Sequence, residues 1–348
     1  MAQQHLDPTE STAGVVTGDA LAVYLRAQAT EFLRALRMHR ETGTSGGAEE
    51  SVDAARALRR SARRISGSLH TFRPLLDADW SEEMRPELAW LSGTLGLEHA
   101  YEARLERLLL ALHRLSGSSP FPAQQVSAGG SAPAAQERGN LTVGAAKAGA
   151  LLDRQLTLAR TRAHSTALQA LGSSRFHAVA DKVAVLASEV PLTTAGVSTD
   201  LRPPAGAAEE RLLDAIAALP LITAGHPYNA EALVHGLSPD PAPHPQDGPW
   251  HQVRLLLRLH RYAREALSGG GLGTPSADPR MLAAGRALDR HRDAAEAAGA
   301  AAQAARTPRI APATAYALGV LHADQRHEVE AARFEFQQSW QRQTVGAP

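Results

Sequence analysis

The stretch "AARALRRSARRISGSLHTF", residues 54–72, combines a row of arginines with a row of apolar residues at helical spacing. With 100° between successive residues, the arginines fall within an arc of roughly 140° on one side of a helix. They are Arg56, Arg59, Arg60, Arg63 and Arg64. The opposite side carries Leu58, Ala62, Ile65 and Leu69, the apolar stripe by which a helix packs against its neighbours. The stretch therefore predicts a helix whose outer face is basic.

No acidic residue interrupts this basic face, because the chain has no carboxylate between Asp53 and Asp77. Solvated helix faces usually mix the two signs, since like charges three or four residues apart repel by a few tenths of a kcal/mol. An external polyanion is the natural partner for a face that lacks local counter-charges.

A second basic face occurs in "PWHQVRLLLRLHRYAREAL", residues 249–267, where His251, Arg254, Arg258 and Arg261 lie within an arc of roughly 80°. The spacing from Arg56 to Arg63 recurs from His251 to Arg258 at an offset of 195 residues. The segments "LGLEHA" (95–100) and "LDRHRD" (288–293) match at an offset of 193. These two agreeing offsets predict an internal duplication.

The composition favours an all-α fold, since Ala, Leu, Arg and Glu dominate and aromatic residues make up only 4% of the 348 residues. Helices are expected at 18–40, 49–71, 81–115, 143–171, 173–188, 208–219, 228–235, 249–268, 278–306, 310–322 and 323–343. Segments rich in Pro, Gly or Ser predict long connecting loops at 116–140, 191–208, 236–249 and 268–279.

The expected organisation is a flexible tail over residues 1–17 followed by one helical domain over 18–345. Within that domain we expect a first half at 18–190, a linker at 191–208 and a second half at 209–345. The sequence shows neither a signal peptide nor a membrane span, so we expect a soluble cytoplasmic protein. Its 36 basic and 36 acidic residues cancel, so a polyanion site must come from local segregation of charge.

These motifs resemble the CHAD domain family, the "conserved histidine α-helical domain". The family opens each half with His-x-x-Arg and a basic pair, and continues with a Leu-Gly-x-x-Arg-Asp segment. His251, Arg254, Arg258 and Arg261 match this pattern in the second half, and Arg292-Asp293 completes it. In the first half Arg59, Arg63 and Arg64 match. There, however, Arg56 stands in place of the signature His, and His99-Ala100 replaces Arg-Asp.

The resemblance implies two four-helix bundles related by a pseudo-twofold axis, and a non-enzymatic protein that binds inorganic polyphosphate in a basic groove. It also implies association with polyphosphate granules, as in some members. The implied binding residues are Arg56, Arg59, Arg60, Arg63, Arg64, His251, Arg254, Arg258, Arg261 and Arg292. Only the second basic face contains a histidine, so we expect pH-dependent binding from that face alone.

Two other functions remain open: a scaffold that binds an acidic protein partner, and a nucleic-acid binder. Single-stranded nucleic acids usually recruit aromatic stacking, and no aromatic residue interleaves with residues 56–64. No catalytic residue, cofactor or metal is expected. The chain lacks cysteine, a His-Glu-x-x-His metal motif, a phosphate-binding P-loop and a Gly-x-Ser-x-Gly elbow. Exchange of Arg63 and Arg258 for Glu should abolish polyphosphate binding and hardly change thermal stability.

Overall fold

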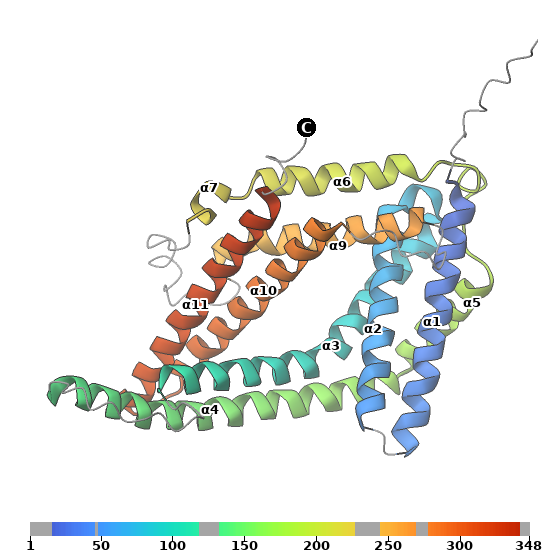
Figure 1. Ribbon diagram of the computed structural model, residues 1–348. Helices are drawn as coiled ribbons and strands as arrows, with labels where there is room; N and C mark the ends of the chain where they lie inside the picture. The colour runs from blue at the N-terminus through green and yellow to red at the C-terminus, as the bar shows by residue number, and fades with distance from the viewer. Residues whose placement is uncertain (1–15, 46–47, 118–131, 227–243, 269–277, 342–348) are drawn as a thin grey trace, which may run out of the picture.

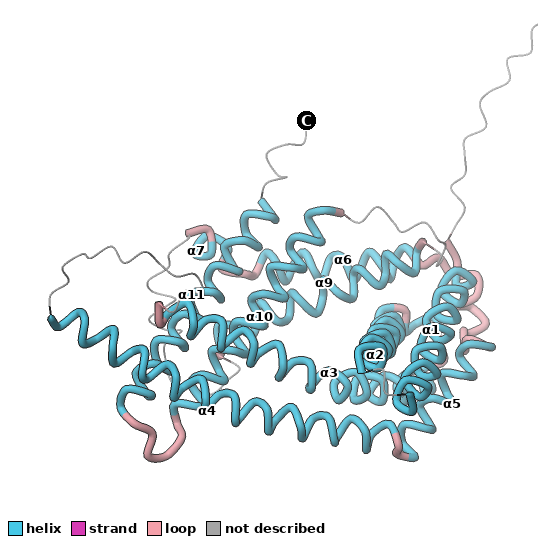
Figure 2. The backbone as a smooth tube through the Cα atoms, turned by 60° about the horizontal axis from the view of Figure 1, so that its bottom comes forward, coloured by secondary structure: helices cyan, strands magenta, loops and turns pink. Residues whose placement is uncertain are grey.

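The computed structural model describes residues 16–45, 48–117, 132–226, 244–268 and 278–341. Within these ranges the regular structure is helical, and no strand is present (Figure 2). Two isolated β-bridges join the loops, one between Thr17 and Asp200 and the other between Leu76 and Leu192. The predicted all-α class is therefore confirmed.

The long helices are arranged in pairs that form the sides of a frame: α1 with α2, α3 with α4, α10 with α11, and α6 with α9 (Figure 1). The helix bounds are α1 Gly18–Ser45, α2 Ala48–Thr71, α3 Ala78–Leu115, α4 Ala132–Leu171, α5 Ser174–Ser188, α6 Arg202–Ala217, α7 Leu221–Ala224, α9 Gly248–Leu267, α10 Pro279–Ala305 and α11 Pro312–Gln341. Short 3₁₀ turns lie at η1 Arg73–Leu75 and η2 Pro245–Asp247.

Helix α2 has the two faces that its sequence predicts. Leu58, Ala62, Ile65 and Leu69 are completely buried in a core shared with α1, α3 and α5. Burying a large aliphatic side chain contributes about 1.5–3 kcal/mol, so this stripe fixes which way the arginine face points. The arginines themselves are exposed or half-buried.

Several helix boundaries differ from the expected ones. Helix α11 is continuous where two helices were predicted, because no proline follows Pro312 within it and a single glycine, Gly319, is tolerated inside a long helix. Helix α6 begins at Arg202 instead of residue 208, because its two prolines occupy the first turn, where a missing N–H costs little. Helix α4 begins at Ala132, inside the predicted loop 116–140. The predicted helix 228–235 and residues 1–15 of the predicted tail lie outside the described residues.

The order of helix pairs repeats along the chain, with α1–α2 and α3–α4 followed by α6–α9 and α10–α11. The two sets also contact each other, because α3 and α4 reach α11 and share a core with it and with α10. The pseudo-twofold relation and the division at 191–208 stay predictions.

A close crossing brings the two basic helices together. A Cβ atom at Gly67 of α2 would lie 2.6 Å from the Tyr262 ring and 3.2 Å from a methyl group of Leu259, both on α9. Only glycine leaves room for this approach. The crossing therefore sets the distance between the two basic faces, which the sequence places 195 residues apart.

Candidate functional site

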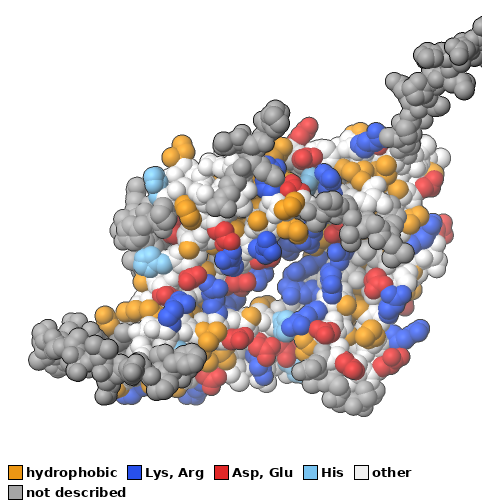
Figure 3. Space-filling model, viewed as in Figure 1, with side chains coloured by type: hydrophobic (Ala, Val, Ile, Leu, Met, Phe, Trp, Pro, Cys, Tyr) orange, Lys and Arg blue, Asp and Glu red, His pale blue; other side chains and the backbone are white. Residues whose placement is uncertain are grey.

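Guanidinium groups from α2, α9 and α10 converge on one region, which we call the central arginine cluster. Its members are Arg59, Arg63, Arg254, Arg258 and Arg292. The pKa values of Arg59, Arg63 and Arg258 are lowered, and the positive charges of other cluster members contribute to each of these shifts. Figure 3 shows Lys and Arg side chains gathered around the hollowed centre of this face. The fold thus joins both predicted basic stripes in a single site.

Three members of the cluster, Arg59, Arg63 and Arg258, make no ion pair with any carboxylate in the described part of the chain. Burial, followed by the charge of Arg59, lowers the pKa of Arg63 to about 10. Burial, followed by the charge of Arg254, lowers the pKa of Arg258 to about 10. Burial and the charge of Arg292 also lower the pKa of Arg59. We call these three residues the unpaired arginines. Their mutual repulsion would be relieved by an anion.

The other two cluster members are already neutralised by carboxylates of α10. Arg254 donates from Nε to Oδ1 of Asp289 at 2.6 Å. Arg292 donates from Nη2 to Oδ1 of Asp293 at 2.7 Å and lies 3.5 Å from Glu296. A ligand must therefore compete with these carboxylates for Arg254 and Arg292.

Arg64 and Arg261 are bound by one carboxylate, that of Glu265 on α9. Arg64 donates from Nε to Oε2 at 2.7 Å and from Nη2 to Oε1 at 3.3 Å, and Arg261 lies 3.6 Å from Oε1. The Tyr24 hydroxyl of α1 donates to the same carboxylate at 3.1 Å. Burial lowers the pKa of Arg64, but its hydrogen bond to Glu265 and the neighbouring charges, that of Glu265 first, together outweigh burial and raise it. These contacts join α1, α2 and α9.

Arg56 and His99, the two first-half residues that depart from the family pattern, contact each other. Arg56 donates from Nε to Nε2 of His99 and forms a 3.0 Å ion pair with Asp53. Arg56 stands at the position that His251 has in the second half, and His99 stands at the position of Arg292. The arginine and the histidine are therefore exchanged between the two halves. Arg60 is exposed, and neither Arg56 nor Arg60 is among the charges that perturb the unpaired arginines. The structure places these two predicted site residues outside the cluster.

Gly96 of α3 makes room for Arg59. A Cβ atom at this position would lie 2.5 Å from the guanidinium carbon. Asp289 occupies the matching position in the repeat, since Gly96 and Asp289 are the second residues of the matched segments 95–100 and 288–293. In the second half the residue at this position, Asp289, pairs with Arg254. In the first half the residue is Gly96, so Arg59 has no carboxylate there.

His251 lies between the arginine cluster and a buried polar network. Its ring meets the His291 ring edge-on, with 5.5 Å between ring centroids, and its Nε2 atom is buried without a hydrogen-bond partner among the described residues. Burial lowers its pKa below the ordinary value. Protonation of His251 therefore requires a more acidic solution than an exposed histidine does.

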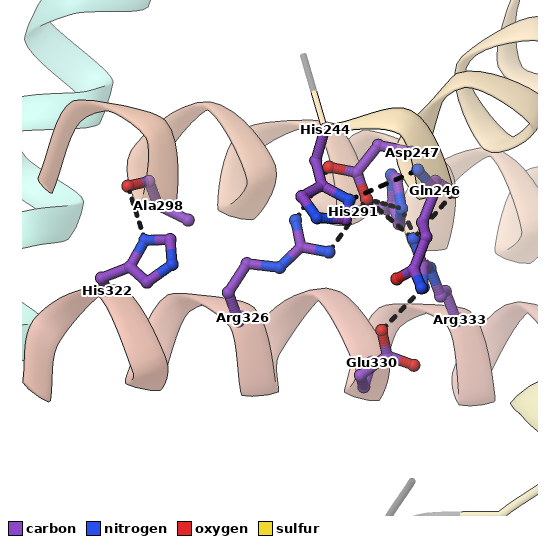
Figure 4. A network of polar contacts seen from close by, with 9 residues as sticks. All are labelled: His244, Gln246, Asp247, His291, Ala298, His322, Arg326, Glu330 and Arg333. Atoms are coloured by element: carbon purple, nitrogen blue, oxygen red, sulfur yellow. Dashed lines mark hydrogen bonds and ion pairs between the residues drawn. The ribbon is translucent and has the colours of Figure 1, made fainter. Parts of the chain in front are cut away.

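The network behind His251 is centred on Asp247, at the start of α9 (Figure 4). Asp247 accepts hydrogen bonds from Arg326 at 2.8 and 3.2 Å and from Arg333 at 2.7 Å. Burial opposes ionisation of Asp247, but the hydrogen bond and charge of Arg326 outweigh it and lower its pKa. Burial and the charge of Arg333 hold the pKa of His291 well below the ordinary value. This network fixes the first turn of α9 against α11.

Sequence reasoning missed this network and also Arg104, which pairs with Glu296 beside the cluster. A signal for the network was present, because Arg326, Glu330 and Arg333 share the helix face that carries Val329 and Phe336. Charged residues at core-facing positions indicate buried ion pairs.

The described ranges contain no group of three or more His, Cys, Asp or Glu side chains placed to hold a metal ion. None of the helices in the described part of the chain combines the length and apolar character needed to cross a membrane.

Comparison with known proteins gives a family and two similar structures. The family model "CHAD domain" matches residues 27–302. PptA from Streptomyces chartreusis is 70% identical, with a TM-score of 0.77 over 94% of this chain and 99% of its own. The CHAD domain from the plant Ricinus communis is 16% identical, with a TM-score of 0.46 over 94% of this chain and 97% of its own. No curated protein matches the chain.

Proposed function

The chain belongs to the CHAD domain family, and from this premise we propose that it binds inorganic polyphosphate through the central arginine cluster. The observation that carries the proposal is the set of unpaired arginines Arg59, Arg63 and Arg258. Three half-buried cations that repel one another and lack carboxylate partners among the described residues destabilise the free protein. A bound anion reverses that effect.

Polyphosphate suits this site because it presents negative oxygens without bases. Arginine forks bind phosphate oxygens through two parallel hydrogen bonds. Few aromatic groups border the cluster: Tyr262 is 5.3 Å from the Arg261 guanidinium and is itself buried against α2. Nucleic-acid binding, which draws on exposed stacking surfaces, is the less favoured function.

The proposal assigns binding without turnover. Guanidinium groups hold phosphate oxygens but are poor proton-transfer groups at neutral pH. We further propose a cytoplasmic protein that associates with polyphosphate granules. Incubation with polyphosphate should release no phosphate, and measurable release by the purified protein would contradict this assignment.

The test is a titration of the purified protein with long-chain polyphosphate and with a single-stranded DNA of equal charge, at about 50 and 200 mM salt. Arg63→Gln and Arg258→Gln should each weaken polyphosphate binding at least tenfold. Arg34→Gln, which removes an exposed cation paired with Glu31 on α1, is the matched control and should have little effect. Equal binding of both polymers, or equal effects of all three variants, would reject the proposal.

A protein partner remains the second candidate function. It would depend on shape and apolar anchors in addition to charge. A protein that binds neither polymer but is stabilised by an acidic polypeptide would favour this function.

A further inference from the structure

Glu265 pairs with Arg64 and so withholds one arginine of the basic faces from a ligand. It binds Arg64 through two hydrogen bonds, lies 3.6 Å from Arg261, and accepts a hydrogen bond from Tyr24. Its side chain is only 21% exposed. A carboxylate with three partners and little water access is costly to displace.

Asp289 differs from Glu265, although it also neutralises a predicted site arginine. Its side chain is 60% exposed, and Arg254 is its only partner among the contacts of the described residues. The Arg254 side chain is 16% exposed, so only one partner of this pair is open to water. A pair with an exposed carboxylate is easier to separate than one enclosed on both sides, so a phosphate oxygen can replace Asp289 at Arg254 more easily than it can replace Glu265 at Arg64.

We propose that Glu265 acts as a built-in anion that sets the number of phosphates the site contacts, by holding Arg64 out of the ligand's reach. The inference rests on the proposed function and refines it. In the native protein the ligand contacts chiefly Arg59, Arg63 and Arg258. The site thus recognises a short run of a polyphosphate chain instead of a track along both complete basic faces.

The number of phosphate contacts can be measured as a salt slope. Each neutralised phosphate of a flexible single-stranded polyanion contributes about −0.7 to the slope of log K against log salt concentration. Three contacts predict a slope of about −2.1 and a loss of affinity of about 18-fold between 50 and 200 mM salt. Four contacts predict about −2.8 and about 50-fold.

The experiment compares the wild-type protein with Glu265→Gln, which removes the charge but keeps an amide oxygen to accept hydrogen bonds from Tyr24 and Arg64. We expect the slope to steepen from about −2.1 to about −2.8. Glu31→Gln on α1 removes the same charge away from the cluster and should leave the slope unchanged. An unchanged slope in Glu265→Gln, or a wild-type slope of about −2.8 or steeper, would overturn the inference.

A second pair of variants decides the matter if Glu265→Gln does not fold. In the native background Arg64→Gln should leave the slope unchanged because Glu265 already holds that guanidinium, whereas Arg63→Gln should make it shallower by about 0.7. Equal changes in both variants would overturn the inference. A wild-type protein that fails to bind polyphosphate would instead reject the proposed function, so the two failures are distinguishable.

Discussion

Replacement of Arg63 by methionine should make the free protein more stable. Burial, together with the charges of Arg59 and Arg254, lowers the pKa of Arg63 from its ordinary value to about 10. This depression corresponds to a cost of about 3 kcal/mol for the charged form. Solvent and salt screen part of that cost, so we expect a net gain of about 1–2 kcal/mol. Methionine removes the charge and keeps an unbranched side chain in the same space.

The pH dependence of this gain follows from the order of the two pKa values. The pKa in the folded protein, about 10, lies below the unfolded value, so the unfolded state holds the proton more tightly. Between pH 6 and 9 both states are protonated and the penalty is fully present. It is relieved only as the pH rises through about 10 towards the pKa of the unfolded chain. The stabilisation by Arg63→Met should therefore be constant across the neutral range.

The assay is urea unfolding of wild type and Arg63→Met at pH 7.5, in 50 and 500 mM salt, with and without polyphosphate. The advantage of the variant should shrink at high salt because the repulsion is screened. Saturating polyphosphate should reverse the order, since a ligand at 100 times its Kd stabilises the wild type by about 2.7 kcal/mol.

Arg34→Met is the control, because Arg34 is exposed and paired with Glu31; its free energy of unfolding should change by less than about 0.5 kcal/mol. A variant Arg63→Met that is less stable than wild type in low salt would refute the reasoning. The packing of the Arg63 stem would then outweigh the repulsion of its charge.

Three further predictions concern the surroundings of the cluster. Asp247→Asn leaves the buried Arg326 without the carboxylate that it pairs with and leaves Arg333 with Glu330 alone. It should lower the free energy of unfolding by about 3–5 kcal/mol in urea denaturation; a loss under 1 kcal/mol would contradict this. His291 is neutral in the fold with a pKa well below the unfolded value, so its contribution to stability is present above about pH 6.5 and is lost as the pH falls below it. His291→Gln should thus flatten the decline of unfolding free energy between pH 6.5 and 5, and an equal decline in both proteins would count against it. Gly96→Ala should displace the flexible guanidinium of Arg59 and weaken polyphosphate binding several-fold in a titration. The control is Gly93→Ala on the same helix, whose added Cβ meets no atom within 4 Å and which should bind as the wild type does. Equal affinities of the two variants would refute this positioning role.

The two basic faces were predictable because helical periodicity is a local property of the sequence. Arg59 and Arg63 were placed correctly on the outer face of α2 from residues 54–72 alone. Their convergence with Arg258 depends on the crossing at Gly67. Nothing in the local pattern marks that glycine as a contact point, so only the family resemblance implied one groove.

The division of the arginines into paired and unpaired groups could not be predicted from the stripes. Arg63 and Arg64 are neighbours in sequence, yet the carboxylate that neutralises Arg64 lies 201 residues away and faces only one of the two. Arg254 and Arg258 likewise share a stripe, and Asp289 pairs with only the first. Such partner choice depends on tertiary geometry, which spacing within one helix does not contain.

The balance of charge over the whole chain bears on which polyanions can use the site. Thirty-six basic and 36 acidic residues leave no net charge, and at physiological salt the field of an exposed cation decays over about 8 Å. A duplex that stays on the surface therefore gains little from the half-buried arginines at the centre of the face. A narrow, flexible chain that enters the hollow meets cations that repel one another and form no direct ion pair with a carboxylate among the described residues. Under the proposed function, selectivity for polyphosphate over duplex nucleic acid arises from access to Arg59, Arg63 and Arg258, and it does not require any group that reads a base.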